Sequence, residues 1–392
     1  MAEGSVQETI EENDWFKFYF ASWYKKSPYF QRTVEAGCTS WDLYNHMLIP
    51  TLYDDDVKEY WHLLEHVTLW DVAVERQVEI TGPDAARFTQ LLTPRDLSTC
   101  AVGQCKYVLL CAPDGGIVND PILLKLAEDR FWLSLADSDA LLYALGVQAF
   151  AGLDVHIREP DVSPLQVQGP KSKPLIRKLF GDEIADLRYY WCAETSLGDI
   201  PVVVSRTGWT GEVGYEVYLR DSSRGLDLWD AIMDAGQEFE IRAIAPSDQR
   251  RLEAGIFNYG NDMDVTNTPY EVTGLERLVE LENDNVVVSR EALERVEREG
   301  VSKKLVGVRI DGEPLGMWLE DFWPVSVGGR EVGKLTSASY SPRLEINMGY
   351  AWVPIESAAH DTRIEITSPS GGLGAAVVPL PFWDATKDVP KA

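Results

Sequence analysis

The spacing of apolar residues along the chain alternates between that of helices and that of strands, which indicates a mixed α+β protein. Helical spacing occurs between residues 55 and 67, at Val57, Tyr60, Leu63, Leu64 and Val67. Alternation from Arg76 to Ile80 predicts a strand, and the turn Gly82-Pro83-Asp84 then leads into a helix over residues 85–92. Asp84 is the predicted N-cap of that helix.

The following segments predict further strands with helices between them. Strands are expected over residues 105–111, 117–126, 130–136, 154–157 and 165–168, and helices over 137–150 and from Gly169-Pro170 to Phe180. A strand, a Gly-Pro pair and a helix occur in this order at residues 76–92 and again at 163–180. The repetition predicts two related α+β halves.

The pattern changes near residue 300. Before that point we expect a hairpin over residues 200–219 and helices over 222–238, 248–257 and 289–299. From residue 303 to 383, short strands separated by Gly-Gly and Ser-Pro turns predict a small all-β domain. A chain of 392 residues is also too long for one ordinary core, so we expect more than one domain.

An aromatic cluster stands near the start of the chain. Residues 15–24, with the sequence WFKFYFASWY, contain seven aromatic side chains, a density that is rarely left in water. Three interpretations stay open: the segment packs on its own domain, it forms a contact in a homo-oligomer, or it covers the active site.

The charge excludes some classes of partner. The net charge is −27, which repels nucleic acids and anionic membranes. No stretch approaches the roughly 18 apolar residues of a membrane span, and no secretory signal precedes residue 15, so we expect a cytoplasmic protein. The five cysteines form no CxxC pair and the histidines are scattered, so we expect no disulfide framework and no metal. His62 and His66 share a predicted helix face as a structural pair.

Two segments offer chemistry. In residues 114–121, with the sequence DGGIVNDP, Asp120 follows a Gly-Gly turn, although an aspartate there is ordinarily a hydrogen-bonding or solvated residue. In residues 206–216, with the sequence RTGWTGEVGYE, three glycines let the backbone approach a flat ligand. Trp209 and Tyr215 offer stacking faces, and Glu212 and Glu216 offer carboxylates. An ordinary glycine-rich hairpin explains the second segment equally well.

Taken in order, these segments resemble the glycine-cleavage T-protein superfamily. The similarity covers roughly residues 28–385. It rests on the two segments above and on four others: Arg251-Leu-Glu-Ala-Gly, Tyr259-Gly-Asn-Asp-Met-Asp264, Leu305-Val-Gly-Val and Gly333-Lys-Leu-Thr-Ser-Ala-Ser-Tyr-Ser-Pro342.

The resemblance implies an α+β fold of three domains around a central channel that holds tetrahydrofolate. It predicts an N-terminal aromatic-rich extension at 1–27, a folate-binding catalytic region of two α+β domains at 28–300, and a C-terminal β-barrel domain at 301–392. It also implies a role for Asp120 in catalysis and for Glu216 at the pterin. Trp209, Tyr107 and Tyr215 are expected to stack on or contact the cofactor.

Within the superfamily, the chain is most similar to dimethylsulfoniopropionate demethylases. The similar segments include Tyr44-Asn-His-Met-Leu-Ile-Pro50, Trp70 to Ile80 and Glu159-Pro-Asp-Val-Ser-Pro-Leu165. T-proteins carry an arginine where this chain has Ser247, and an aspartate where it has Asn119. Both differences point away from an aminomethyltransferase, which needs a lipoylated carrier protein.

The expected reaction moves a methyl group from a small onium donor, such as dimethylsulfoniopropionate, to N5 of tetrahydrofolate. Aromatic faces bind a methylated cation, and the candidates are Trp191, Tyr44 and Trp41, whereas core packing better explains Trp70. Arg95 or Arg206 is the candidate partner of a donor carboxylate. Two alternatives stay open: one-carbon transfer from another N-methyl or O-methyl compound, including aminomethyl transfer, and folate binding without catalysis.

Overall fold

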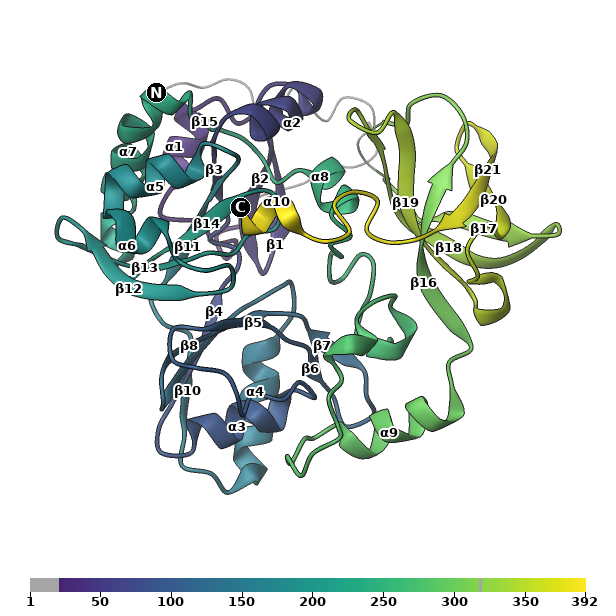
Figure 1. Ribbon diagram of the computed structural model, residues 1–392, viewed down its shortest axis with the longest axis horizontal. Coiled ribbons are helices and arrows are strands. Elements are labelled where there is room, and N and C mark those ends of the chain that lie inside the picture. The colour runs from purple at the N-terminus through teal and green to yellow at the C-terminus, as the bar shows by residue number, and fades with distance from the viewer. Residues whose placement is uncertain (1–20, 317–318) are drawn as a thin grey trace.

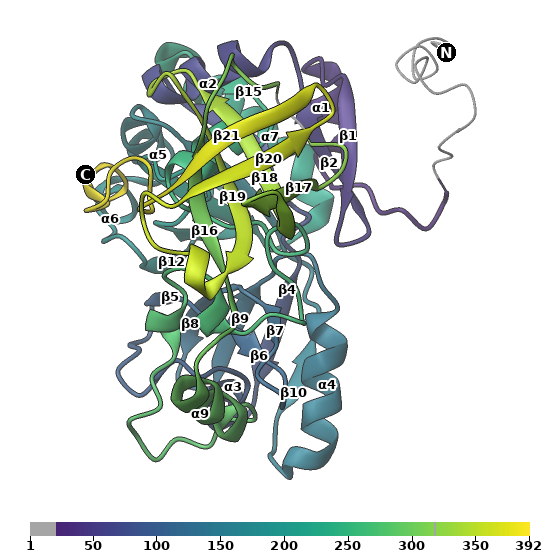
Figure 2. The same cartoon turned by 90° about the vertical axis from the view of Figure 1, so that its right-hand side faces the viewer.

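The computed structural model describes residues 21–316 and 319–392, arranged as three lobes around a centre (Figure 1). Two lobes are each built on an open sheet, and the third is a closed barrel. Figure 2, turned by 90°, shows the barrel in front of the lobe that contains α5 (Ser172–Phe180) and α7 (Gly225–Gly236), with the lobe that contains α3 (Ala85–Leu92) and α4 (Ala140–Ala151) below it. The predicted aromatic segment 15–24 lies mostly outside the described residues.

The first lobe contains a six-stranded sheet with the order β12-β13-β14-β11-β3-β15. Its strands are β3 (Thr68–Asp71), β11 (Ser163–Gln168), β12 (Cys192–Leu197), β13 (Ile200–Ser205), β14 (Gly214–Leu219) and β15 (Arg242–Ala243). The hairpin of β1 (Ser40–Tyr44) and β2 (Met47–Leu52) belongs to the same lobe. Its helices are α1 (Phe30–Glu35), α2 (Asp56–Glu65), α5 (Ser172–Phe180), α6 (Asp182–Ala185) and α7 (Gly225–Gly236).

The second lobe contains a five-stranded sheet with the order β10-β4-β9-β8-β5. Its strands are β4 (Gln77–Thr81), β5 (Cys105–Tyr107), β8 (Ile122–Ala127), β9 (Arg130–Ser134) and β10 (His156–Arg158). Helices α3 (Ala85–Leu92) and α4 (Ala140–Ala151) pack on it around a core that includes Ile80, Phe88 and Phe131. Asp84 is the N-cap residue of α3, as expected, but its side chain makes no capping hydrogen bond. Its carboxylate binds Arg87 and the backbone N–H of Asp154 instead.

Two predicted strands are each broken in the middle. Residues 105–111 form β5 and β6 (Leu110–Cys111), and residues 117–126 form β7 (Ile117–Asn119) and β8. Pro121 interrupts the second strand because a proline has no N–H to donate to a ladder. The break leaves Asp120 at a bend between two strands rather than inside one.

The succession of strand, Gly-Pro turn and helix that the sequence predicted twice is present at both places. Strand β4 leads into α3 and strand β11 leads into α5, through turns at residues 82–84 and 169–171. Strands β13 and β14 form the expected antiparallel hairpin, with Val204 opposite Val217.

The third lobe is a closed barrel with the order β16-β19-β18-β17-β20-β21. Its strands are β16 (Lys303–Ile310), β17 (Trp323–Val327), β18 (Arg330–Ser341), β19 (Ile346–Pro354), β20 (Arg363–Ser368) and β21 (Gly371–Val378). The expected α+β fold with a C-terminal all-β barrel is therefore confirmed. Helices α8 (Asp248–Glu253) and α9 (Arg290–Glu299) lie between the sheets and the barrel in sequence, and α10 (Asp388–Lys391) follows the barrel.

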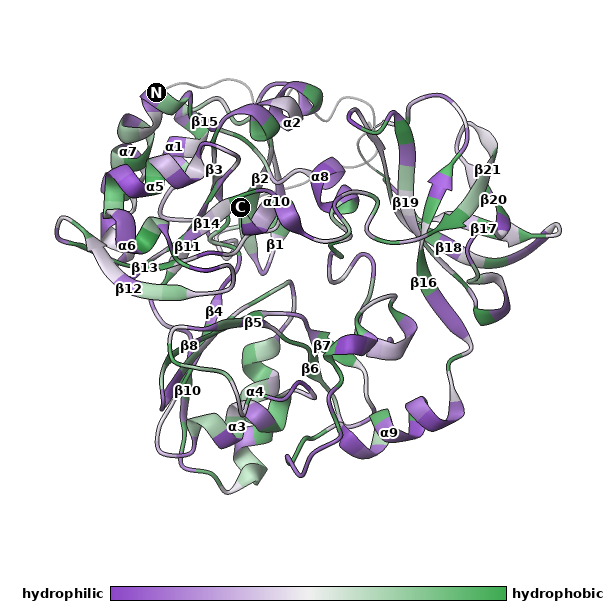
Figure 3. Ribbon diagram, viewed as in Figure 1, coloured by the Kyte–Doolittle hydropathy of each residue, from purple (hydrophilic) through white to green (hydrophobic). Residues whose placement is uncertain are grey.

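The helices differ in their polarity. Figure 3 shows α9 largely hydrophilic, whereas α4 is largely apolar. Helix α8 ends at Glu253, four residues before the predicted end at 257, and Gly255 follows with a positive φ of 69°. Within the described residues, none of the helices combines the length and apolar character that crossing a membrane requires.

Candidate active site

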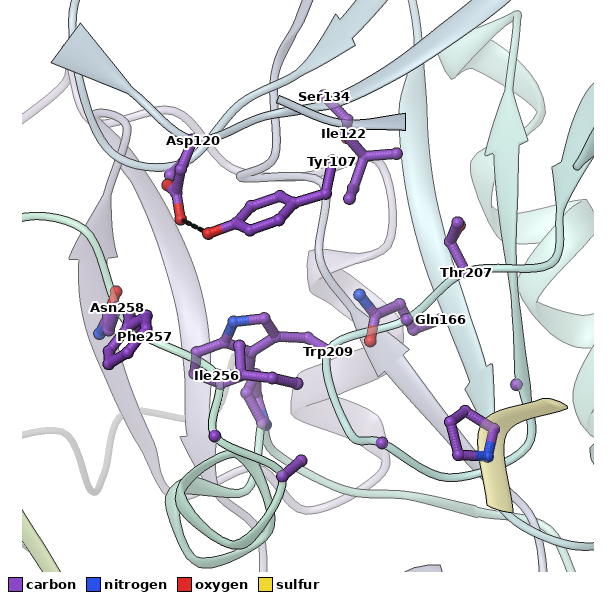
Figure 4. A pocket seen from close by; sticks show the side chains of 18 of the residues that line it. Tyr107, Asp120, Ile122, Ser134, Gln166, Thr207, Trp209, Ile256, Phe257 and Asn258 are labelled. Atoms are coloured by element: carbon purple, nitrogen blue, oxygen red, sulfur yellow. Dashed lines mark hydrogen bonds between the residues drawn. The ribbon is translucent and has the colours of Figure 1, made fainter. Parts of the chain in front are cut away.

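A cavity of about 790 Å³ lies where the two sheet lobes and the end of the chain meet. Its walls come from segments far apart in sequence. They include the β1–β2 hairpin, the end of β3, the loop after β13, the strands β5 and β8, and residues 380–390. Figure 4 shows Tyr107 and Asp120 on one side of this space and Trp209 and Gln166 on the other.

Asp120 is held at the bend between β7 and β8. The hydroxyl of Tyr107 donates a hydrogen bond of 2.8 Å to Oδ2 of Asp120 (Figure 4). Its other oxygen, Oδ1, is buried and has no hydrogen-bond partner among the residues that the structure describes. Burial raises the pKa of Asp120 to about 7, partly offset by the Tyr107 hydrogen bond. The carboxyl can therefore exchange a proton near neutral pH.

Glu216 lies on β14 at the other end of the cavity and is only 2% exposed. Nε2 of Gln166 donates to it at 2.8 Å, and the hydroxyl of Tyr218 donates at 2.9 Å. The hydroxyl of Thr207 makes a short hydrogen bond to the same carboxylate. Gln166 stands directly opposite Glu216 across the β11–β14 pair. These donors form the surroundings of an ionised carboxylate.

The loop between β13 and β14 brings Trp209 to the cavity. The sequence suggested that the glycines of this segment let the backbone approach a ligand, but two of them make room for a side chain of the protein instead. A Cβ atom at Gly208 or Gly214 would lie 2.3 or 2.1 Å from Oε1 of Gln168. The space beside these two glycines is thus filled by a buried side chain of the protein itself.

The structure brings Tyr44 and Arg95 to the cavity as expected. Nη1 of Arg95 donates to the carbonyl of Tyr107 at 2.5 Å. Its Nε is buried without a partner in the described part of the chain. Burial, and after it the charge of Asp120, raises the pKa of Tyr44, so this side chain stays a neutral phenol.

Four other expected residues do not line the cavity. Tyr215 points to the face of β14 opposite Glu216, because side chains alternate along a strand, and its hydroxyl binds the carbonyl of Ala185. Arg206 is turned away and donates to the carbonyl oxygens of Pro390 and Ala392, at 3.0 and 2.7 Å.

The remaining two are aromatic. Trp191 packs under the guanidinium of Arg188, whose Cζ lies 3.9 Å from the centre of the Trp191 ring. Trp41 packs against Phe30, with ring centres 5.7 Å apart. The described residues that line the cavity include neither tryptophan, which corrects the expectation that they contact a methylated donor.

Several polar residues of the wall were not foreseen, and they include Gln166 and Glu75. Glu75 lies just after β3. The sequence contained a signal for Glu75, since this acidic residue directly follows the buried apolar run Val72-Ala-Val74. Glu212, offered as a ligand, instead binds the buried Arg250 at 2.9 Å.

Comparisons with known proteins agree with this architecture. Residues 16–283 match the family model of the GCVT N-terminal domain. Residues 303–384 match the glycine cleavage T-protein C-terminal barrel domain.

The chain belongs to the glycine cleavage T-protein family. This membership confirms the expected class of enzyme, a tetrahydrofolate-dependent one-carbon transferase.

Individual relatives carry two different names. Dimethylsulfoniopropionate demethylase DmdA of Ruegeria pomeroyi is 39% identical over 92% of this chain and 97% of that protein. An aminomethyltransferase of Symbiobacterium thermophilum is 30% identical, again over 92% of this chain and 97% of that protein.

A solved structure supports the fold. The glycine cleavage system aminomethyltransferase T from Bartonella henselae superposes with a TM-score of 0.82, at 22% identity, over 92% of this chain and 98% of that chain. Ser247 caps α8, and its hydroxyl accepts from the N–H of Arg250 at 3.3 Å.

Proposed function

We propose that this chain moves a methyl group from a small onium donor, such as dimethylsulfoniopropionate, to N5 of tetrahydrofolate. The products are then 5-methyltetrahydrofolate and methylmercaptopropionate. The observation that carries the proposal is Asp120, whose buried, unpartnered Oδ1 lies in a cavity wall that faces Trp209. The 39% identity to a dimethylsulfoniopropionate demethylase supports the choice of donor.

The cavity walls fit a reduced folate. Trp209 and Tyr107 offer aromatic faces for a flat ring, and Glu216 with Gln166 provides a polar end for its nitrogen-rich edge. When bound, tetrahydrofolate would supply a secondary amine, N5, as the acceptor of the methyl group.

Asp120 accepts the proton that methylation of a secondary amine releases. Its carboxyl is suited to this role because its pKa is about 7, near the pH at which it must be ionised to accept the proton. The Tyr107 hydroxyl holds Oδ2, and Oδ1 is left without a hydrogen-bond partner among the described residues. The apolar wall residues Val72, Ile122 and Ile256 exclude water from the reaction.

Tyr44 and Arg95 are our candidates for the donor site. An aromatic face beside a cation contributes about 0.5–2 kcal/mol, and Tyr44 is a candidate for that contact among the described wall residues. Arg95 has an unpartnered Nε and supplies positive charge for a donor carboxylate. This local charge acts against the net charge of −27 of the whole chain.

The test is a turnover assay with tetrahydrofolate and a panel of methylated donors, with folate products separated by mass. We expect 5-methyltetrahydrofolate from dimethylsulfoniopropionate. Turnover only with an N-methyl or O-methyl compound would show that this compound, and not dimethylsulfoniopropionate, is the methyl donor. Formation of 5,10-methylenetetrahydrofolate from a lipoylated carrier would indicate an aminomethyltransferase. Folate binding without any turnover would indicate a binding protein. A cytoplasmic location and the division at residues 27 and 300 stay predictions.

A further inference from the structure

A second carboxyl group lies at the polar end of the cavity, next to Glu216. Nε2 of Gln166 donates to Oε1 of Glu216 at 2.8 Å and to Oε1 of Glu75 at 3.2 Å. One amide nitrogen therefore bridges the two carboxyl groups, and all three residues line the cavity. Two carboxyl groups this close do not both ionise readily, because their like charges repel each other in a partly dry site.

The hydrogen-bond donors around each group show where the negative charge belongs. Glu216 receives hydrogen bonds from Gln166, Tyr218 and Thr207, with Ser205 further away at 3.4 Å. Within the described residues, the Glu75 carboxyl receives only the bond from Gln166 and one of 3.3 Å from Ser134. Because each donor stabilises an ionised carboxylate, the charge belongs on Glu216 and the proton on Glu75.

The remaining neighbours of Glu75 do not reverse this assignment. The titratable groups that face it are Tyr44 on β1 and, with Glu216, Tyr218 on β14. The next residue, Arg76, directs its Nε to Glu159 at 2.7 Å. Burial, and after it the charge of Glu216, raises the pKa of Glu75 well above the usual range of a glutamate.

We propose that Glu75 and Glu216 share one proton and together bind a heterocycle edge that carries both a donor and an acceptor. The Glu216 carboxylate accepts an N–H, and the Glu75 acid donates to a neighbouring carbonyl or ring nitrogen. The pterin edge of a folate has this pattern, with N–H groups beside a ring carbonyl. The inference rests on the proposed function, because it takes a reduced folate as the ligand.

The consequence is a loss of affinity at alkaline pH. Only the form with Glu75 protonated donates, so the apparent dissociation constant rises as pH passes the pKa of Glu75. Above that pKa the increase is about tenfold per pH unit, because the competent fraction falls by that factor. Asp120 also titrates, near pH 7, and must be removed from the measurement.

The experiment therefore uses Asp120→Asn as the parent protein. We would measure the dissociation constant of 5-formyltetrahydrofolate from about pH 5 to about pH 9, the range in which buried glutamates titrate. The affinity of the parent protein for 5-formyltetrahydrofolate should fall as pH rises. The double variant Asp120→Asn, Glu75→Gln should bind as the parent does at low pH, within about threefold, and without pH dependence, because the amide donates at every pH. The control Asp120→Asn, Glu216→Gln should bind about tenfold or more weakly throughout.

A calorimetric measurement in two buffers provides a second readout that does not depend on the Glu75 variant. Above the pKa of Glu75, binding to the parent should take up about one proton. A parent whose affinity is independent of pH and that takes up no proton would overturn the inference alone. So would a pH dependence that survives Glu75→Gln. A wild-type protein that binds no reduced folate at any pH would overturn the proposed function as well.

Discussion

At the scale of single residues, the wall of the cavity contains polar side chains with an atom that has no hydrogen-bond partner among the described residues. Oδ1 of Asp120 and Nε of Arg95 are buried and make no hydrogen bond within the described residues. Because an unpaired buried polar atom costs about 1–3 kcal/mol, we propose that a bound ligand supplies the missing partner.

Asp120→Asn should lower kcat by about 10²–10⁴-fold, because asparagine cannot accept the proton that methyl transfer releases. The dissociation constant of the folate should change much less, because Glu216 and Gln166 lie at the other end of the cavity. In the wild-type protein saturated with folate, kcat should rise with pH up to about 7 and then level off, following ionisation of Asp120.

Tyr107→Phe is the matched control for this assignment. The Tyr107 hydrogen bond lowers the pKa of Asp120, so its removal should shift the rising limb of the profile to higher pH. A stable Asp120→Asn protein that keeps half of the wild-type kcat would contradict the catalytic role.

Glu75 should also affect the stability of the protein. Its pKa is raised on folding, so the folded state favours the proton, and the stability that this proton contributes is lost as pH rises through the folded-state pKa. Glu75→Gln carries no such proton and should melt at a higher temperature than wild type in alkaline buffer, with little difference in acid. Thermal melts across pH measure this, and equal melting temperatures at every pH would contradict it.

The sequence was informative about some residues and silent about others. The motif around Asp120 and the one around Trp209 predicted both residues at the cavity, where the structure places them. Strand alternation would have excluded Tyr215, because Glu216 beside it faces the cavity. Trp41, Trp191 and Arg206 were chosen by residue type alone, and only tertiary packing determines which way such side chains point.

At the scale of elements, the β13–β14 hairpin depends on glycines that make room for Gln168. Its amide Nε2 donates to the carbonyls of Thr207 and Tyr215, at 3.3 and 3.2 Å, and its Oε1 accepts from Thr210 at 2.8 Å. One buried side chain thus fixes both ends of the loop that presents Trp209.

Gly214→Ala should destabilise the protein by about 1–3 kcal/mol, because the new methyl group overlaps Gln168. Gly372→Ala is the matched control, since it also lies in a strand, β21, and a Cβ there meets nothing within 4 Å. Urea unfolding of the two variants compares them. Equal stabilities would show that Gln168 moves aside without cost.

The elements themselves were largely predictable, since most follow from apolar spacing. The helix near 55–67 and the hairpin over 200–219 are found as α2 and β13–β14. The break between β5 and β6 was not predictable, because the apolar run from Tyr107 to Cys111 gives no sign of the point where a ladder stops. Pro121, by contrast, marks the break between β7 and β8 in the sequence itself. The break at Pro121 matters most, since it places Asp120 in the wall of the cavity.

At the scale of the whole molecule, the two sheet lobes and the end of the chain share one binding space. A ligand that bridges them stabilises the folded state as a whole. Reduced folate at a hundredfold excess over its dissociation constant should add about 2.7 kcal/mol to the free energy of unfolding. Thermal unfolding measures this as a rise in melting temperature, with a pterin-free aminobenzoylglutamate as the control. No shift with millimolar reduced folate would contradict the folate assignment.

The position of the wall segments along the chain also determines when the cavity is completed during synthesis. Leu380, Trp383 and Pro390 form part of its wall, and Arg206 fastens the same stretch through the carbonyls of Pro390 and Ala392. A ribosome that has made both sheets and the barrel has therefore not yet made a complete binding site. The nascent chain acquires its full wall only after residue 390 has left the exit tunnel.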